Sequence, residues 1–124
     1  MLKGLTFLNS ELRLALILSL GAVLGSLIRW HLNYNLISNV IGSGLIGLLF
    51  GIEVSSKLYV FFAVGFCGSL TTFSGLMLSS ANLVSLGKGI DFLVIIIVHL
   101  LLGILSLVLG YKLGRKINFA RLPK

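Results

Sequence analysis

Acidic residues are scarce in this chain, which has three among its 124 residues. Glu11, Glu53 and Asp91 each stand where an apolar run begins or ends, so no carboxylate is expected deep inside such a run. Cysteine occurs once, as Cys67, which excludes an intrachain disulfide and fits a small apolar filler. Because no nucleophile–base pair or cluster of metal-ligating side chains is recognisable, the chain is not expected to be an enzyme.

Charge of either sign is sparse, and apolar residues dominate the composition. Charged residues make up 10% of the chain and its mean hydropathy is +1.12, values typical of a membrane protein. The apolar runs recur over the whole length, which argues against a signal peptide on a soluble domain. We therefore predict an all-α membrane protein, a single four-helix transmembrane domain over residues 1–124 with spans at about 11–30, 35–53, 58–84 and 91–112.

The ends of the expected helices carry local signals. Ser10 is expected to cap the first helix and Asp91 the fourth, and residues 112–124 form a basic tail. The short link over residues 53–57 predicts a tight antiparallel hairpin of the second and third spans.

The basic residues are divided unequally between the two expected membrane surfaces. The side with both termini and the 53–57 link has eight of them, against Arg29 and Lys88 on the other: Lys3, Arg13, Lys57, Lys112, Arg115, Lys116, Arg121 and Lys124. The positive-inside rule then predicts a multi-pass protein of the plasma or inner membrane with both termini in the cytoplasm. The formal net charge of +7 suits contact with anionic membrane lipid. Since the basic tail directly follows a span, no nucleic-acid partner is expected.

The third segment is too long to be a simple span. Residues 58–87 carry no charge and would form a straight helix of about 45 Å, against a hydrocarbon core of about 30 Å. Two threonines at its midpoint, Thr71 and Thr72, lie among glycines. This composition predicts a helix broken at mid-membrane, where protein or a wet cavity covers the freed backbone groups. Close helix packing by small residues is the alternative that composition leaves open.

Polar residues mark the other three segments. In the first, the uncharged stretch 14–28 gives only about 22 Å of helix, so Arg13 or Arg29 must snorkel, or one of the two must lie in a wet vestibule. In the second, Asn39 needs a hydrogen-bond partner, whereas helix capping or interfacial water suffices for Asn35. The opposite face of the second segment carries glycines that are expected to pack against a helix: Gly44, Gly47 and Gly51. The fourth segment carries a stripe of mostly small residues that is expected to face protein: His99, Gly103, Ser106, Gly110 and Gly114.

Residues 65–74 read GFCGSLTTFS, and residues 39–43 read NVIGS. Together with Arg29, these stretches resemble the Fluc (CrcB) family of small fluoride channels, whose signature is matched at nine of its first ten positions. Ser69 stands where that signature has a second glycine.

The resemblance implies a fluoride-specific channel that exports F⁻ from the cytoplasm and so lowers fluoride toxicity. The fluoride path would be lined by Asn39, Thr72, Phe73 and Ser74. An amide and hydroxyls donate hydrogen bonds to an anion, and the edge of a phenyl ring carries the positive part of its quadrupole. Structural or vestibule roles are expected for Arg29 and Ser43.

The resemblance also implies a structural Na⁺, which is not transported, at the centre of an antiparallel dimer. By motif position, the backbone carbonyls of Gly68 and Thr71 would hold it, and such oxygen ligands suit a hard cation.

The chain departs from the family pattern in its third and fourth segments. Leu76 replaces a second path phenylalanine, and Ile95 replaces a tyrosine. His99 stands where a small hydroxyl residue is usual. A proton relay and a neutral, hydrogen-bonded histidine are its two interpretations, of which we favour the second. Because the missing residues accompany a strong charge bias, we expect the antiparallel partner to be a related chain, a paralogue of opposite orientation, rather than a second copy.

Two alternative functions compete with a fluoride channel. A small multidrug-resistance-type proton-coupled antiporter has a similar size, but it needs a glutamate inside its first span, and Glu11 lies at the membrane edge. A non-conducting accessory subunit of a heterodimeric channel is the other alternative, kept open by Leu76 and Ile95.

Overall fold

The computed structural model describes residues 2–121, and side chains over 9–118. The described chain is all-helical, without a strand, and has four helical segments long and apolar enough to cross a membrane. These are Asn9–Leu32, Asn35–Ile52, Ser56–Ser85 and Gly89–Asn118. The predicted all-α membrane fold is thus confirmed. Of the predicted basic residues, Lys124 lies outside the described part.

The first and last helices extend well past their predicted spans. Helix α1 runs over Leu2–Leu32, so Ser10 lies inside it and the predicted cap at Ser10 is wrong. Helix α6 runs over Gly89–Arg121, which places Asp91 in its first turn rather than at its cap. There, a carboxylate still stabilises the positive end of the helix dipole. No proline interrupts either helix, and the predicted basic tail therefore continues α6 as far as the described residues reach.

The third segment is divided into pieces, as the glycine–threonine pattern predicts. It comprises α3 (Ser56–Tyr59), the wide-turned η1 (Val60–Cys67), α4 (Gly68–Leu70) and α5 (Phe73–Ser85). The backbone is extended at Thr71 and Thr72, between α4 and α5. The break predicted from the sequence is therefore present. The π-helical turns of η1, in which each N–H reaches one residue further back, were not predicted.

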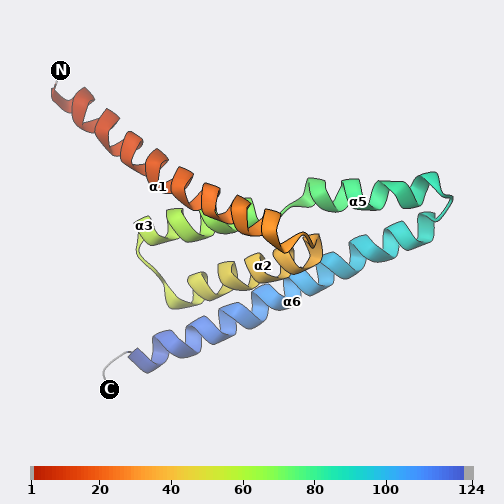
Figure 1. Ribbon diagram of the computed structural model, residues 1–124. Coiled ribbons are helices and arrows are strands. Elements are labelled where there is room, and N and C mark those ends of the chain that lie inside the picture. The colour runs from red at the N-terminus through yellow and green to blue at the C-terminus, as the bar shows by residue number, and fades with distance from the viewer. Residues whose placement is uncertain (1, 122–124) are drawn as a thin grey trace.

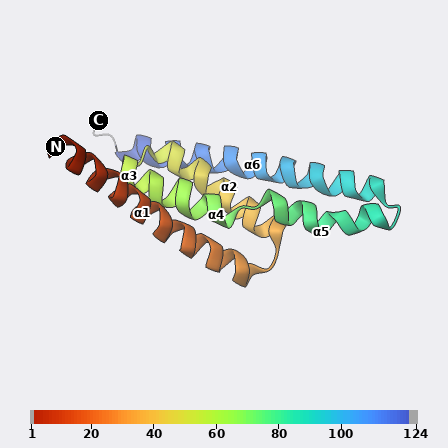
Figure 2. The same ribbon diagram turned by 90° about the horizontal axis from the view of Figure 1, so that it is seen from above.

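The helices form a bundle with both termini at one end (Figures 1 and 2). Helix α2 (Asn35–Ile52) lies along α6, and α1 lies along η1 and α4. The turn between α2 and α3 lies at the same end as the termini, and Phe50 and Tyr59 pack edge-to-face across this hairpin with ring centroids 5.4 Å apart. At the other end, α5 extends beyond α1 and is accompanied by the start of α6 (Figure 1).

Two glycine-lined contacts hold the bundle together, as the small-residue faces predict. Between α2 and α6, a methyl group added at Gly47 would overlap the Leu107 carbonyl, and one added at Gly110 would overlap that of Gly44. Between α1 and η1, a methyl group at Gly65 would come within 2.6 Å of the Leu18 carbonyl oxygen. Backbones approach this closely only where no Cβ intervenes, which is how helices in lipid associate without a hydrophobic driving force.

Candidate functional site at the break in the third span

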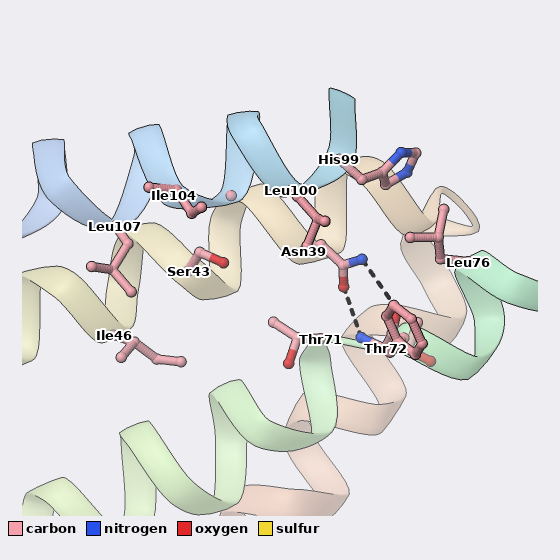
Figure 3. Close-up of a pocket in the computed structure, with 12 residues that line it drawn as sticks. Asn39, Ser43, Ile46, Thr71, Thr72, Leu76, His99, Leu100, Ile104 and Leu107 are labelled. Atoms are coloured by element: carbon pink, nitrogen blue, oxygen red, sulfur yellow. Dashed lines mark hydrogen bonds between the residues drawn. The ribbon is translucent and has the colours of Figure 1, made fainter. Parts of the chain in front are cut away.

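The helix break is held by a side chain from another helix. Asn39 of α2 donates from Nδ2 to the Thr72 carbonyl at 3.1 Å and accepts the Thr72 N–H at Oδ1 at 2.7 Å (Figure 3). Both backbone polar groups of Thr72 are thereby satisfied inside the bundle, where an unpaired group would be costly. The partner that the Asn39 amide requires is thus the extended peptide itself.

The Thr72 side chain starts the next helix. Its Oγ1 accepts the N–H of Gly75 at 3.0 Å, the bond of a helix N-cap, and lies 3.3 Å from the Ser74 hydroxyl. Thr71 closes the preceding helix, since both its N–H and its hydroxyl donate to the Cys67 carbonyl, at 2.9 and 3.0 Å. The two threonines therefore do different work, one ending α4 and the other beginning α5.

Because of these bonds, two backbone carbonyls lose the N–H donors that they would have in a continuous helix. In a continuous helix the Gly68 carbonyl would accept the N–H of Thr72, which here is donated to Asn39. The Thr71 carbonyl would accept the N–H of Gly75, which here is donated to Thr72 Oγ1. Gly68 and Thr71 are the two positions at which the sequence predicts cation-binding carbonyls. A hard oxygen donor set of this kind suits Na⁺, and the described residues contain no cluster of three or more His, Cys, Asp or Glu side chains.

An inner cavity of about 340 Å³ opens beside the break. Its polar lining comes from α2, the break and α6: Asn39, Ser43, Thr71, Thr72 and His99. The rest of its wall is apolar: Ile46, Phe73, Leu76, Leu100, Gly103, Ile104 and Leu107. Asn39 uses one of the two hydrogens on Nδ2 for Thr72, which leaves one N–H without a partner among the described residues. This remaining N–H, surrounded by apolar side chains, is a donor that could hold an anion weakly.

A second cavity of about 630 Å³ lies on the other side of the break, at the end of α1. Arg29, Asn35, Thr72 and Ser74 are among its polar lining residues. Only Thr72 lines both cavities, so the extended peptide is the partition between them. Arg29 lines this second cavity, which we call the vestibule, whereas Ser43, grouped with it from the sequence, lines the inner cavity.

Asn35 is the residue whose place the sequence interpretation missed. Helix α2 is capped at Tyr34, without a side-chain cap bond, so Asn35 is not the cap. A methyl group added at Gly75 would come within 2.9 Å of Asn35 Oδ1, which puts this amide beside the start of α5. The signal was available in the spacing, because Asn35 and Asn39 lie one turn apart on a single face of α2.

His99 and Leu76 line the inner cavity at the positions where the chain departs from the family pattern. His99 Nδ1 lies 2.8 Å from the Ile95 carbonyl oxygen, and since a carbonyl only accepts, Nδ1 carries the proton of this bond. Leu76 is 2% exposed, whereas Phe73 is 64% exposed on the single chain. The leucine therefore belongs to the protein's own core, and the phenylalanine presents most of its ring outward.

Comparison with known proteins places the chain in a family. Residues 16–111 match the model described as CrcB-like protein, Camphor Resistance (CrcB). A Parasynechococcus marenigrum protein named "Fluoride-specific ion channel FluC 2" is 40% identical over the whole chain and 98% of its own length. A Prochlorococcus marinus "Fluoride-specific ion channel FluC 1" is 34% identical over 94% of each chain. A Neisseria meningitidis "Fluoride-specific ion channel FluC" is 34% identical over 82% of this chain and 94% of its own. The resemblance seen in the sequence is thus confirmed, and the chain belongs to the CrcB family.

Proposed function

We propose that this chain forms a passive fluoride channel, which lets F⁻ leave the cytoplasm and so lowers fluoride toxicity. The observation that carries the proposal is the Asn39–Thr72 pair, which holds an extended peptide between two cavities. The relatives named as fluoride-specific channels supply the identity of the ion. No catalytic activity is proposed.

In this proposal the ion passes along donors at the partition. Fluoride is small and strongly hydrated, so its water must be replaced by several hydrogen bonds without creating a trap. The vestibule offers Arg29 and the Ser74 hydroxyl, the partition offers the Thr72 hydroxyl, and the inner cavity offers the remaining Asn39 N–H. Phe73 adds a ring edge. No fixed charge lines the inner cavity, which is consistent with an ion that binds and leaves quickly.

We propose further that a structural Na⁺ is held by the Gly68 and Thr71 carbonyls where two chains meet. Gly68 is exposed, and a methyl group added there would come no closer than 4.0 Å to Ala63 O, its nearest neighbour. The surface around these carbonyls is thus open to a second chain. When bound, Na⁺ would offset the negative ends of these carbonyl dipoles, and the hydrogen bonds of Asn39 and Thr72 leave the carbonyls without their usual helix donors.

The proposed partner is a paralogous chain in antiparallel orientation. The bundle has both termini at one end. The charge bias of the sequence therefore favours insertion into the cell inner membrane with both termini on the cytoplasmic side. Names numbered FluC 1 and FluC 2 among the relatives are consistent with paired chains in one organism. An oppositely oriented paralogue would supply the phenylalanine and tyrosine replaced here by Leu76 and Ile95.

Fluoride efflux from liposomes tests the proposal. The protein is reconstituted alone and together with its paralogue, and F⁻ release is followed with a fluoride electrode, with Cl⁻ release as the control. Release of F⁻ but not Cl⁻ is expected, and it should be strongest with both chains. Absence of F⁻ release in every combination would refute a channel, and proton-coupled cation release would favour an antiporter. Equal labelling of the termini from both sides, with full release by this chain alone, would refute the need for a paralogue.

A further inference from the structure

A groove of about 840 Å³ lies between α1 and α3, away from both cavities of the helix break. Its polar rim includes Arg13 and Lys57, with Asn9 and Ser56 beside them, and its wall includes Leu14 and Ile17. Neither the proposed ion path nor the dimer contact at Gly68 uses these residues.

Among the described residues, neither cation of the groove has a carboxylate partner. The one ion pair among the described residues joins Arg115 to Glu53 at 3.9 Å, and both of its side chains are largely exposed. Glu11 is two positions before Arg13 on α1, and residues at that spacing do not face each other on a helix. The groove therefore presents two unneutralised positive charges to any ligand.

The position of the groove matches the membrane surface. Arg13 directly precedes the uncharged run 14–28, and Lys57 directly precedes the uncharged run 58–87. The polar rim therefore lies at headgroup level. The wall below it belongs to the hydrocarbon region, where Leu14 is 39% exposed on the chain.

The groove exists because α1 and the third span separate toward the termini. Near the bundle centre Gly21 and Gly65 let their backbones touch, and this contact reaches Leu18. Beyond Leu18 the larger Leu14 and Ile17 replace glycine, and α1 diverges from α3 (Figure 1). A wedge between two membrane helices must be filled, since neither water nor vacuum is favourable beside apolar side chains.

We propose that this groove binds one anionic phospholipid, with the phosphate held by Arg13 and Lys57 and an acyl chain along Leu14 and Ile17. Asn9 and Ser56 are placed to donate to the same headgroup. Charge complementarity and depth select this occupant: a zwitterionic lipid brings its own cation next to the two cations of the groove, and a soluble acidic peptide leaves the apolar wall uncovered. The inference is independent of which ion the channel carries.

Native mass spectrometry of the delipidated protein, titrated with phosphatidylglycerol, tests the site. Each basic residue beside an anionic lipid contributes about fivefold in affinity, so Arg13→Gln with Lys57→Gln should weaken binding of the first lipid about 25-fold. The matched control is Lys112→Gln with Lys116→Gln, which removes two charges on the same side of the membrane, outside the groove. It should bind the first lipid as the natural protein does. The charge-preserving pair Arg13→Lys with Lys57→Arg should retain most of the affinity.

Three outcomes would overturn the proposal. Equal weakening in the groove and control variants would mean that overall charge attracts lipid without a site. Equal affinity for phosphatidylcholine would remove the role of the two cations. Displacement of the lipid by millimolar inorganic phosphate would identify the ligand as a free anion. Size-exclusion profiles of all variants are compared with that of the natural protein, and the comparison of phosphatidylglycerol with phosphatidylcholine on the natural protein keeps the test decisive should the neutral pair fail to fold.

Discussion

The side-chain amide of Asn39 is bonded to both backbone polar groups of Thr72, 33 residues later in the chain. This pair of hydrogen bonds has two effects. It stabilises an extended peptide inside a bundle of helices, and it orients the remaining Asn39 N–H relative to the inner cavity. The structural role of this residue and its proposed role in the ion path are therefore coupled, and substitutions must be chosen to separate them.

Asn39→Asp is expected to abolish fluoride efflux. A carboxylate can still accept the Thr72 N–H, but it cannot donate to the Thr72 carbonyl and it repels an anion in the cavity. Efflux from liposomes measures the effect, with Asn82→Asp as the matched control, because Asn82 is exposed on α5 and lines neither cavity. Normal efflux through folded Asn39→Asp would exclude this residue from the path.

Gly68→Val is expected to leave the single chain folded and to weaken dimer assembly. A methyl group added at Gly68 would meet its nearest atom outside the local helix backbone, the Ala63 carbonyl oxygen, only at 4.0 Å, so this chain leaves room for a side chain. The matched control is Gly89→Val, at a position with nothing within 4 Å. Subunit association is measured in detergent, with Na⁺ and with N-methylglucamine instead. Normal assembly of Gly68→Val, or assembly and conduction unaffected by long Na⁺ removal, would contradict the proposed cation site.

Gly47→Ala is expected to destabilise the protein by about 1–3 kcal/mol, because the new methyl group overlaps the α6 backbone at Leu107. Gly103→Ala serves as the control on the same helix pair. Its added methyl group would lie at an ordinary 3.5 Å from Ser43 Oγ. Denaturation by a harsh detergent, followed by circular dichroism, compares the two variants. Equal stability would show that α2 and α6 separate at no cost.

Thr72→Val is expected to reduce both stability and fluoride efflux, because it removes the hydroxyl that accepts the Gly75 N–H and lies in both cavities. The loss of the cap alone costs about 1 kcal/mol. Thr72→Ser keeps the hydroxyl and should restore both properties. If Val and Ser behave alike, the hydroxyl has neither role.

His99→Gln is expected to retain fluoride efflux. The Nδ1 proton is donated to the Ile95 carbonyl, which anchors the ring to its own helix, and we expect the ring to serve as a hydrogen-bonded group rather than to pass protons. The informative measurement is efflux with the proton gradient collapsed by an uncoupler. Dependence of the natural protein on that gradient, lost in His99→Gln, would support a proton relay instead.

Patterns of short range in the sequence predicted much of this fold. The glycine faces of α2 and α6 follow from spacing alone, because side-chain positions on a helix repeat every 3.6 residues. The break at Thr71 and Thr72 was expected from the length of the run and the surrounding glycines. These features depend on neighbours in the sequence.

Features that depend on remote contacts were not predicted. No local rule joins Asn39 to the backbone of Thr72, and the face that Asn35 shares with Asn39 does not by itself identify Gly75 as the neighbour of Asn35. The open side of Gly68 could be recognised only from the structure, in which most other glycines within the spans would meet a neighbouring helix through an added methyl group. Helix ends were also misplaced at Ser10, because the potential cap residue lacks a nearby helix breaker and the helix simply continues.

The pairing of Asn39 with Thr72 has a consequence for biosynthesis. A ribosome adds about 5–20 residues per second, so the 33 residues between them take about two to seven seconds to make. During that interval the α2 segment is delivered toward the bilayer with its amide still lacking its final partner. The segment Asn35–Ile52 is apolar enough as a whole to cross a membrane, so it can enter with this amide still unpaired. When the third span enters the membrane, Asn39 Oδ1 and Nδ2 are therefore already present to bind the backbone of Thr72. The position of the break in the third span is thus determined by a helix that is synthesised before it.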